Sequence, residues 1–202
     1  MCMDIRNLKN WKEHPKIRKL KEKLEDEKLR KSLKWIFEIV VTLVFAALTA
    51  VLMFQTVTMQ ESSMEPTLEV GDKFFMNQAV YKVSSPQRGD VIVFRTSASD
   101  DAALHIRRVI GLPGETIRIR DGVIYIDGEV YDEAADYPDI VNPGLAQNGV
   151  SLKSGEYFVL GDNRNNSEDS RYGDIGTVKK RYIVGKLWFT CSPRGKIGIL
   201  KG

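Results

Sequence analysis

The chain has 202 residues, of which 28% are charged and 9% aromatic, and it contains 7 prolines. These values are typical of a folded protein and argue against a disordered or collagen-like chain. The net charge of +3 is unevenly distributed, because residues 1–34 carry 12 Lys/Arg against 6 Asp/Glu and residues 35–202 carry 18 against 21. A uniformly basic nucleic-acid-binding protein would not divide its charge in this way, so we expect no nucleic acid among the partners.

The first 34 residues form a basic leader. Residues 10–34 alternate in charge and place Leu20, Leu24 and Leu29 at near-helical spacing. This pattern is typical of a solvated or membrane-surface helix. A docking helix for a cytoplasmic partner is the alternative.

Residues 35–54 are nearly all apolar, with Glu38 as the only charge. Twenty residues at about 1.5 Å each make a helix about 30 Å long, which matches a bilayer core. The sequence therefore predicts one transmembrane helix, in preference to a buried helix of a soluble domain. We expect it to remain as a signal anchor, because its apolar stretch and its leader are longer than those of a cleaved signal peptide.

Basic residues lie mainly before this helix. Twelve precede it, and the next one after it is Lys73. The positive-inside rule then places the N-terminus in the cytoplasm and residues 55–202 outside the cell membrane. The two cysteines, Cys2 and Cys191, would lie on opposite sides, so we expect no disulfide within one chain.

The hydrophobic pattern changes after residue 55 from a helical period to a period of two. Runs of β-branched and aromatic residues occupy residues 90–95, 105–111, 116–120, 123–131, 156–161 and 182–189. Asp121-Gly122 and Asp127-Gly128 fit tight turns that need a positive φ. The sequence therefore predicts an all-β domain with consecutive hairpins, and residues 132–155 form a surface excursion to which it assigns no role.

Four motifs follow the apolar segment. They are ESSMEPTL at residues 61–68 with GDK at 71–73, RGDVIVF at 88–94, IRRVIGLPG at 106–114, and GDNRNNSEDSR at 161–171. A single serine near a proline is most often a turn former or a cap. Together, in this order and spacing, the motifs resemble the conserved boxes of type I signal peptidases. The resemblance covers residues 35–190, and the single span with only 45 residues between Glu115 and Gly161 resembles the Gram-positive form.

The resemblance implies a mainly β, signal-peptidase-like fold of antiparallel sheets on a single N-terminal transmembrane helix. It implies three regions: a cytoplasmic leader (residues 1–34), a signal anchor (35–54) and an extracytoplasmic catalytic domain (55–202). Its activity would be that of a membrane-anchored serine endopeptidase, a hydrolase that uses a Ser/Lys dyad to release signal peptides at small-x-small sites. The implied partners are secretory preproteins and membrane lipid, with the secretion machinery as a further candidate. Neither a metal-ligand cluster nor a phosphate-binding glycine loop is visible, so we expect no metal and no cofactor.

By position, the resemblance assigns Ser63 as the nucleophile, with its own backbone N–H as a donor to the oxyanion. Ser167 corresponds to the serine that hydrogen-bonds the dyad lysine, and Asp169 with Arg171 to a buried supporting ion pair. Glu61 stands where some members supply a hydroxyl to the oxyanion hole. We expect Glu61 to point away from that hole, or the backbone donor to act alone.

The resemblance also implies that an extended peptide adds as a strand between residues 58–62 and 104–107. The candidate substrate-binding residues are Met59, Gln60, Met64, Leu68 and Ile106. For the four apolar ones, plain core packing is an equally good interpretation.

The dyad lysine position holds Arg107, in the segment His105-Ile106-Arg107-Arg108-Val109. A guanidinium stays protonated in proteins and accepts no hydrogen bond, so Arg107 cannot act as an ordinary general base. Loss of general-base assistance typically slows a reaction by about 10²- to 10⁴-fold, so we expect impaired activity. His105 is an alternative base, although a strand would place it about 6.6 Å from Arg107 along the chain.

Two other classes of protein share parts of this pattern. The first is a non-catalytic signal-peptidase-like factor, such as those of pilus assembly, which binds a secreted partner without cleaving it. Those relatives lose the serine as well, whereas this chain keeps Ser63. The second is the self-cleaving repressors, which would need a DNA-binding helical domain in place of the leader and span; no such domain is visible.

Overall fold

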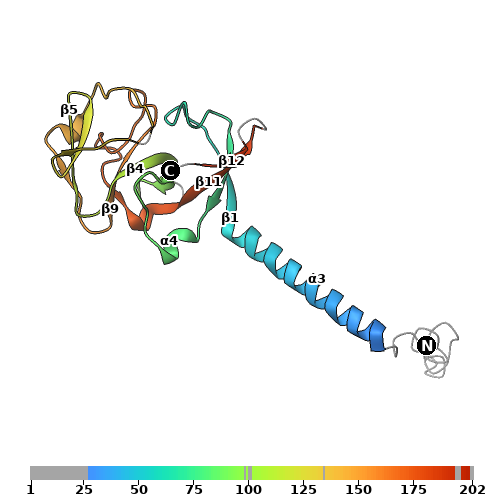
Figure 1. Ribbon diagram of the computed structural model, residues 1–202. Helices are drawn as coiled ribbons and strands as arrows, with labels where there is room; N and C mark the ends of the chain where they lie inside the picture. The colour runs from blue at the N-terminus through green and yellow to red at the C-terminus, as the bar shows by residue number, and fades with distance from the viewer. Residues whose placement is uncertain (1–26, 98, 100–101, 134, 194–196, 201–202) are drawn as a thin grey trace, which may run out of the picture. The chain divides into compact units, whose positions relative to one another are not determined.

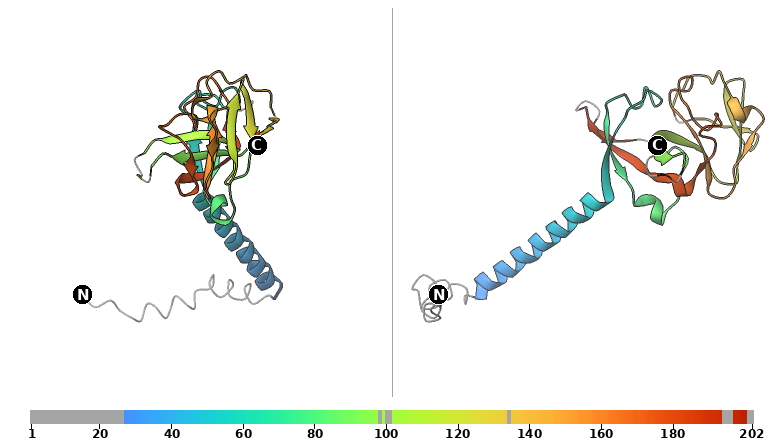
Figure 2. Two further views of the ribbon diagram at one scale, coloured as in Figure 1. Left: turned by 90° about the vertical axis from the view of Figure 1, so that its left-hand side faces the viewer. Right: turned by 180° about the vertical axis from the view of Figure 1, so that it is seen from behind.

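The computed structural model describes residues 27–97, 99, 102–133, 135–193 and 197–200. The surface helix expected within residues 10–34 therefore lies mostly outside the described residues. The chain divides into two compact units, Met1–Leu52 and Met53–Gly202. Figures 1 and 2 show the N-terminal helix and the β domain.

The N-terminal helix, α3 (Glu27–Met53), has 27 residues. It contains a candidate membrane span, Lys28–Thr49, with a mean hydropathy of 1.8 and no residue of its most apolar part buried. Two polar side chains within its apolar part, Thr42 and Thr49, donate to backbone carbonyls one turn earlier. Glu38 lies 3.9 Å from Lys34, also one turn earlier. These three contacts all lie within the helix.

The β domain contains two antiparallel sheets in its described part. The larger has the order β1 (Phe54–Thr58), β2 (Lys73–Asn77), β11 (Ile183–Ser192), β3 (Val91–Arg95), β4 (Leu104–Gly111), β9 (Glu156–Leu160) and β10 (Val178–Lys179), with β12 (Gly198–Ile199) beside β11. The smaller has the order β7 (Glu129–Val130), β6 (Val123–Ile126), β5 (Thr116–Arg120) and β8 (Val150–Ser151). The short helices are α4 (Val80–Val83), η1 (Gly144–Gln147) and η2 (Lys180–Tyr182). The smaller sheet lies at the end of the domain away from β1 and β12 (Figure 1).

The mainly β prediction is confirmed, and each of the predicted runs contains at least one strand. Asp121-Gly122 and Asp127-Gly128 both have positive φ and join β5 to β6 and β6 to β7. Residues 132–155 hold η1 and β8, which the sequence did not indicate. The predicted span also ended one residue late, because Phe54 already belongs to β1, where its backbone pairs with Asn77 and its ring packs 5.4 Å from Trp188.

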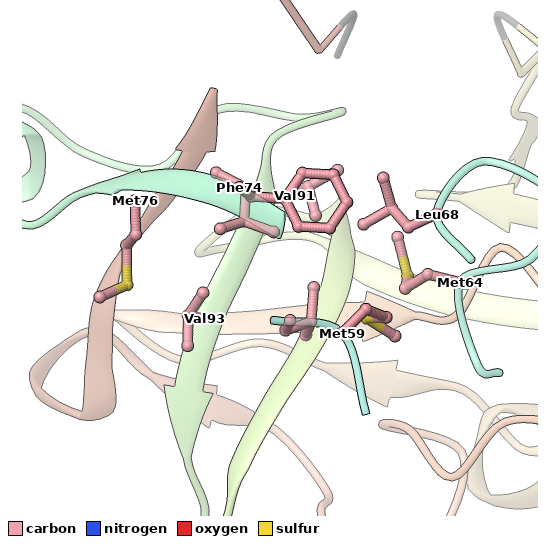
Figure 3. Packing of buried hydrophobic residues seen from close by; sticks show 9 residues of the cluster. Met59, Met64, Leu68, Phe74, Met76, Val91 and Val93 are labelled. Atoms are coloured by element: carbon pink, nitrogen blue, oxygen red, sulfur yellow. The ribbon is translucent and has the colours of Figure 1, made fainter. Parts of the chain in front are cut away.

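Three hydrophobic clusters form the core of the β domain. One fills the space between the loop after β1 and the strands β2, β3, β4 and β11 (Figure 3). Its buried members are Met59, Met64, Leu68, Phe74, Met76, Val91, Val93, Ile106 and Leu187. Burial of apolar surface on this scale is the main stabilising contribution to such a domain. It also fixes the loop that carries residues 59–68 against the sheet.

Candidate active site

Within the part of the chain that the structure describes, a groove runs between two strand edges that have no strand beside them. β1 ends the larger sheet, and β2 is its one pairing partner there. β4 pairs with β3 along residues 104–108, but its pairing with β9 begins only at Arg108, so one side of residues 104–107 is open. Both edges line one groove of about 830 Å³, to which residues 55–61 contribute from one side and Leu104 and Ile106 from the other. Open strand edges present backbone donors and acceptors that an extended peptide can pair with.

Ser63 lies in the loop after β1 and is only 3% exposed. Residues of the 161–171 motif form hydrogen bonds to the backbone of this loop. The backbone N–H of Asn163 donates to the Ser63 carbonyl over 3.0 Å, and its side-chain amide donates to the Ser62 carbonyl over 3.1 Å. Gly161 permits this approach, because a Cβ atom there would lie 2.4 Å from the Ser63 carbonyl oxygen. Among the described residues nothing accepts a hydrogen bond from the Ser63 N–H, so this donor is available to an oxyanion.

Arg107 extends from β4 to Ser63 and is fully buried. Its Nη1 donates to Ser63 Oγ over 2.7 Å and also to the carbonyl of Ile106 over 2.7 Å. Its Nε donates to the carbonyl of Glu168 over 2.7 Å. Arginine has no acceptor, so Arg107 binds the lone pairs of Ser63 Oγ and leaves the hydroxyl proton in place.

The Glu61 carboxylate lies on Arg107. Its Oε1 is 2.6 Å from Arg107 Nη1, and its Oε2 is 3.4 Å from Nη2. The Glu61 side chain is 41% exposed and lines the groove, whereas Arg107 is buried. The Glu61 carboxylate, whose charge would oppose an oxyanion, therefore forms an ion pair with Arg107. Ser63 and Glu61 accept hydrogen bonds from the same nitrogen atom.

Ser167 lies next to Ser63 and Gly161 but makes no hydrogen bond to Arg107 in the described structure. Its buried Oγ has no hydrogen-bond partner among the described residues. The longer arginine side chain bonds the carbonyl of Glu168 instead. A buried hydroxyl without a partner is unfavourable by about 1–3 kcal/mol. The Ser167 hydroxyl is therefore not used by the arginine at position 107.

Asp169 and Arg171 form a buried salt bridge. Two guanidinium nitrogens of Arg171 lie 2.8 Å from the two carboxylate oxygens of Asp169, and both side chains are at most 1% exposed. Asp169 also accepts a hydrogen bond from the backbone N–H of Gly161. The pair therefore fixes Gly161, the residue that lies against Ser63.

The structure separates the five candidate substrate-binding residues into two groups. Met59, Gln60 and Ile106 line the groove. Met64 and Leu68 are at most 1% exposed and pack inside the hydrophobic cluster next to Met59, as Figure 3 shows. For these two residues the structure shows core packing rather than a groove wall.

His105 makes no hydrogen bond to Ser63 in the described structure. Its ring packs 5.7 Å from the ring of Phe94, its cross-strand neighbour on β3, and its buried Nδ1 has no partner there. Burial, and secondarily the charge of Arg107, lowers the pKa of His105 below its usual value. The lowered pKa favours the neutral imidazole. The described residues also include no group of three or more His, Cys, Asp or Glu that could hold a metal ion.

Sequence reasoning did not identify the contacts of Glu61, Gly161 and Asn163. Glu61 and Arg107 are 46 positions apart, and Asn163 is 101 positions from Ser62, so no local pattern connects them. One signal was available: two positions that depart from the family pattern carry opposite charges. Such a pair of departures is a reason to expect a contact.

Comparisons with known proteins identify the family of this chain. A family model described as signal peptidase, peptidase S26, matches residues 32–191. Probable signal peptidase I-2 of Synechocystis sp. is 38% identical over 144 residues, which cover 69% of this chain and 63% of that protein. Signal peptidase I T of Bacillus subtilis is 33% identical over 179 residues, which cover 85% of this chain and 91% of that protein.

A crystal structure of a signal peptidase I from Enterococcus faecalis is 34% identical, covers 52% of this chain and 98% of that chain, and has a TM-score of 0.42. The Bacillus enzymes are matched over nearly their whole length, and the relatives described above are signal peptidases rather than non-catalytic factors. The family model covers more than half of the chain, from α3 to β11. The chain therefore belongs to the signal peptidase family of serine peptidases, peptidase S26.

Proposed function

We propose that this chain cleaves secreted preproteins with Ser63 as its nucleophile. The observation that carries this proposal is the position of Ser63 beside a groove with two open strand edges. Glu61, which lines the groove, and Ser63 are bonded to the same nitrogen of Arg107, so the hydroxyl lies next to the groove wall. A peptide that adds as a strand in the groove would bring its scissile carbonyl to Ser63.

The chemistry is acyl transfer. Ser63 Oγ attacks the carbonyl carbon and forms an acyl-enzyme, which water then hydrolyses. The Ser63 N–H stabilises the oxyanion, and the Arg107 guanidinium, which donates to Oγ, stabilises negative charge on that atom as the proton leaves. Arg107 does not accept the proton, so a chain with no other base would be slower than a lysine dyad by about 10²- to 10⁴-fold.

The anchor and the topology are part of the same proposal. Aromatic side chains of α3 such as Trp35, Phe37 and Phe45 are 67–71% exposed, which fits contact with lipid tails better than contact with water. We place residues 35–53 in the cell membrane, the basic residues 1–34 in the cytoplasm and residues 54–202 outside. Membrane lipid and secretory preproteins are then the partners, and contact with the secretion machinery is consistent with this location.

The test uses the full chain in liposomes with one secretory preprotein, and mass spectrometry to identify the released peptide. Cleavage after a small-x-small motif that Ser63→Ala abolishes is the expected result. Cleavage that persists in Ser63→Ala rejects Ser63 as the nucleophile. Preprotein that stays bound to the chain and uncut at every pH would indicate a binding factor instead of a peptidase.

A further inference from the structure

The geometry points to Glu61 as the group that takes the proton of Ser63. This inference rests on the proposed role of Ser63 and supplies the base that this role lacks. A serine hydroxyl needs an acceptor for its proton as the oxygen attacks, and a guanidinium cannot be that acceptor. The acceptor has to come from elsewhere in the site.

Arg107 holds Ser63 and Glu61 side by side. Its Nη1 lies 2.7 Å from Ser63 Oγ and 2.6 Å from Glu61 Oε1. Two oxygens bonded to one nitrogen are close enough for one water molecule to bridge them, which is within the reach required of a general base. The Arg107 side chain is itself fixed by the carbonyls of Ile106 and Glu168, so it holds both oxygens in place.

Two other potential acceptors nearby, Asp169 and His105, are engaged elsewhere. The Asp169 carboxylate accepts from Arg171 and from the Gly161 N–H. His105 packs against Phe94. In the described structure, Glu61 provides the only carboxylate that contacts Arg107.

The exposure of Glu61 fits the remaining proton transfers. Its side chain is 41% exposed and lines the groove, whereas Ser63 and Arg107 are buried. A group at the boundary between the buried nucleophile and the groove can exchange protons with the peptide and with water. Arg107 orients the carboxylate toward the nucleophile and is therefore a positioning residue.

The proton balance closes over one cycle. The Ser63 O–H bond breaks, its proton passes to the Glu61 carboxylate, and the Oγ–C bond forms. The resulting acid gives this proton to the leaving amine as the C–N bond breaks. The carboxylate then takes a proton from the water that attacks the acyl-enzyme, and the proton returns to Ser63 as the peptide acid leaves.

The first test compares kcat/KM of the full chain with those of Glu61→Gln and Glu65→Gln. Glutamine keeps the shape of Glu61 and an oxygen for Arg107 but does not act as a base. Glu65 is two residues after Ser63, and its side chain is not among the groups that Arg107 contacts, so Glu65→Gln is the matched control. We expect Glu61→Gln to lower kcat by about 100-fold or more, with little change in KM, and Glu65→Gln to change it less than about threefold. Equal activity of the two variants overturns the inference.

The second readout is the pH profile, which a purely structural role of Glu61 would not move. Carboxylic acids in proteins titrate on average near pH 4 and histidines near pH 6.5. The charged or titratable groups around Glu61 are Arg107, in contact, and His105, which interacts electrostatically with Glu61, Arg107 and Glu168. If residue 61 is the base, Glu61→His moves the acid limb of the pH profile upward, because an imidazole then replaces a carboxylate. An acid limb that is the same in both chains overturns the inference.

A double variant separates failure of this inference from failure of the proposed function. Glu61→Ser with Arg107→Lys removes the carboxylate and restores a lysine beside Ser63. If the unchanged chain is silent while the double variant cleaves, Glu61 is not a base and the peptidase site is still intact. If both are silent, the inference and the proposed function fail together.

Discussion

Arg107 and Ser63 are joined by a hydrogen bond of 2.7 Å in which the arginine is the donor. The direction of this bond decides the chemistry, because the oxygen of the nucleophile is bound through its lone pairs and its proton is left for another group. The group nearest to this bond is the Glu61 carboxylate, 2.6 Å from the same nitrogen. Positions 61, 63 and 107 therefore have to be considered together.

Arg107→Lys alone is not expected to raise activity. The adjacent Glu61 carboxylate would hold the new ammonium group in its charged form, in which it cannot accept a proton. In a Glu61→Ser background the same change should raise kcat/KM by about 100-fold or more, since the lysine can then lose its proton. A double-mutant cycle on cleavage rates measures this difference, and additive effects of the two changes would contradict it.

Gly161→Ala should displace the nucleophile. The added Cβ would lie 2.4 Å from the Ser63 carbonyl oxygen and 2.2 Å from Ser167 Oγ, so the loop must move. Overpacking of this kind typically lowers the free energy of unfolding by about 1–3 kcal/mol. Gly173→Ala is the matched control, because a Cβ there meets nothing within 4 Å. Thermal unfolding and peptide release, measured on both variants in the same detergent, should be affected only in Gly161→Ala.

Asp169→Asn should lower the free energy of unfolding by about 3–5 kcal/mol, because it leaves the buried Arg171 without its negative partner. Glu115→Gln is a useful comparison, since the Arg88–Glu115 pair is partly exposed, with side chains 26% and 20% accessible. Glu115→Gln should lower the free energy of unfolding by less than Asp169→Asn does, because water can solvate the Arg88 charge that remains. Urea unfolding of the full chain in detergent would measure both, and an equal loss would show that the buried pair has no special role.

Ser167→Ala should stabilise the unchanged chain. The buried Ser167 hydroxyl has no partner in the described structure, so its removal loses no hydrogen bond and relieves an unfavourable buried polar group, and we expect the free energy of unfolding to rise by about 1–3 kcal/mol. In the double variant that combines Glu61→Ser with Arg107→Lys, the shorter lysine side chain can use this hydroxyl, and Ser167→Ala should then lower peptide release. A marked loss of activity in the unchanged chain would show that Ser167 already acts there.

His105 should make the β domain less stable in mild acid. Its pKa is lowered in the folded state, first by burial and then by Arg107, so the unfolded chain binds more protons once the pH falls below about 6.5. The free energy of unfolding should therefore decrease from about pH 7.5 to about pH 5.5. His105→Gln should flatten this dependence, and His14→Gln, at the other histidine of the chain, should not. Urea midpoints at the two pH values give the comparison.

The strands and turns of the β domain could be predicted because their signals are local. The alternating run at residues 116–120 and the Asp121-Gly122 turn each depend on neighbours within a few positions. β1 and β2 were missed for the opposite reason. Residues 54–58 continue directly from an apolar helix, and their strand character comes from pairing with residues 73–77, which no short window shows.

The candidate site was predictable only in part for a related reason. The motifs indicated Ser63 and Arg107, because the resemblance attaches a role to each position. The contact of Glu61 with Arg107 depends on how the loop after β1 folds over β4, and side-chain reach across that distance is a property of the tertiary structure. The sequence left Met64 and Leu68 open between groove and core; both lie in the core cluster, as does the groove-lining Met59.

The ion pair between Glu61 and Arg107 also constrains how this site could have arisen. A carboxylate introduced beside a lysine would hold it protonated, and an arginine introduced without the carboxylate would be a buried cation with no counter-ion. Each single change is therefore unfavourable, whereas the two together are tolerated. Among relatives of this chain, an arginine at the position of residue 107 should be accompanied by an acidic residue at the position of residue 61, and the two should have been exchanged as a unit during evolution.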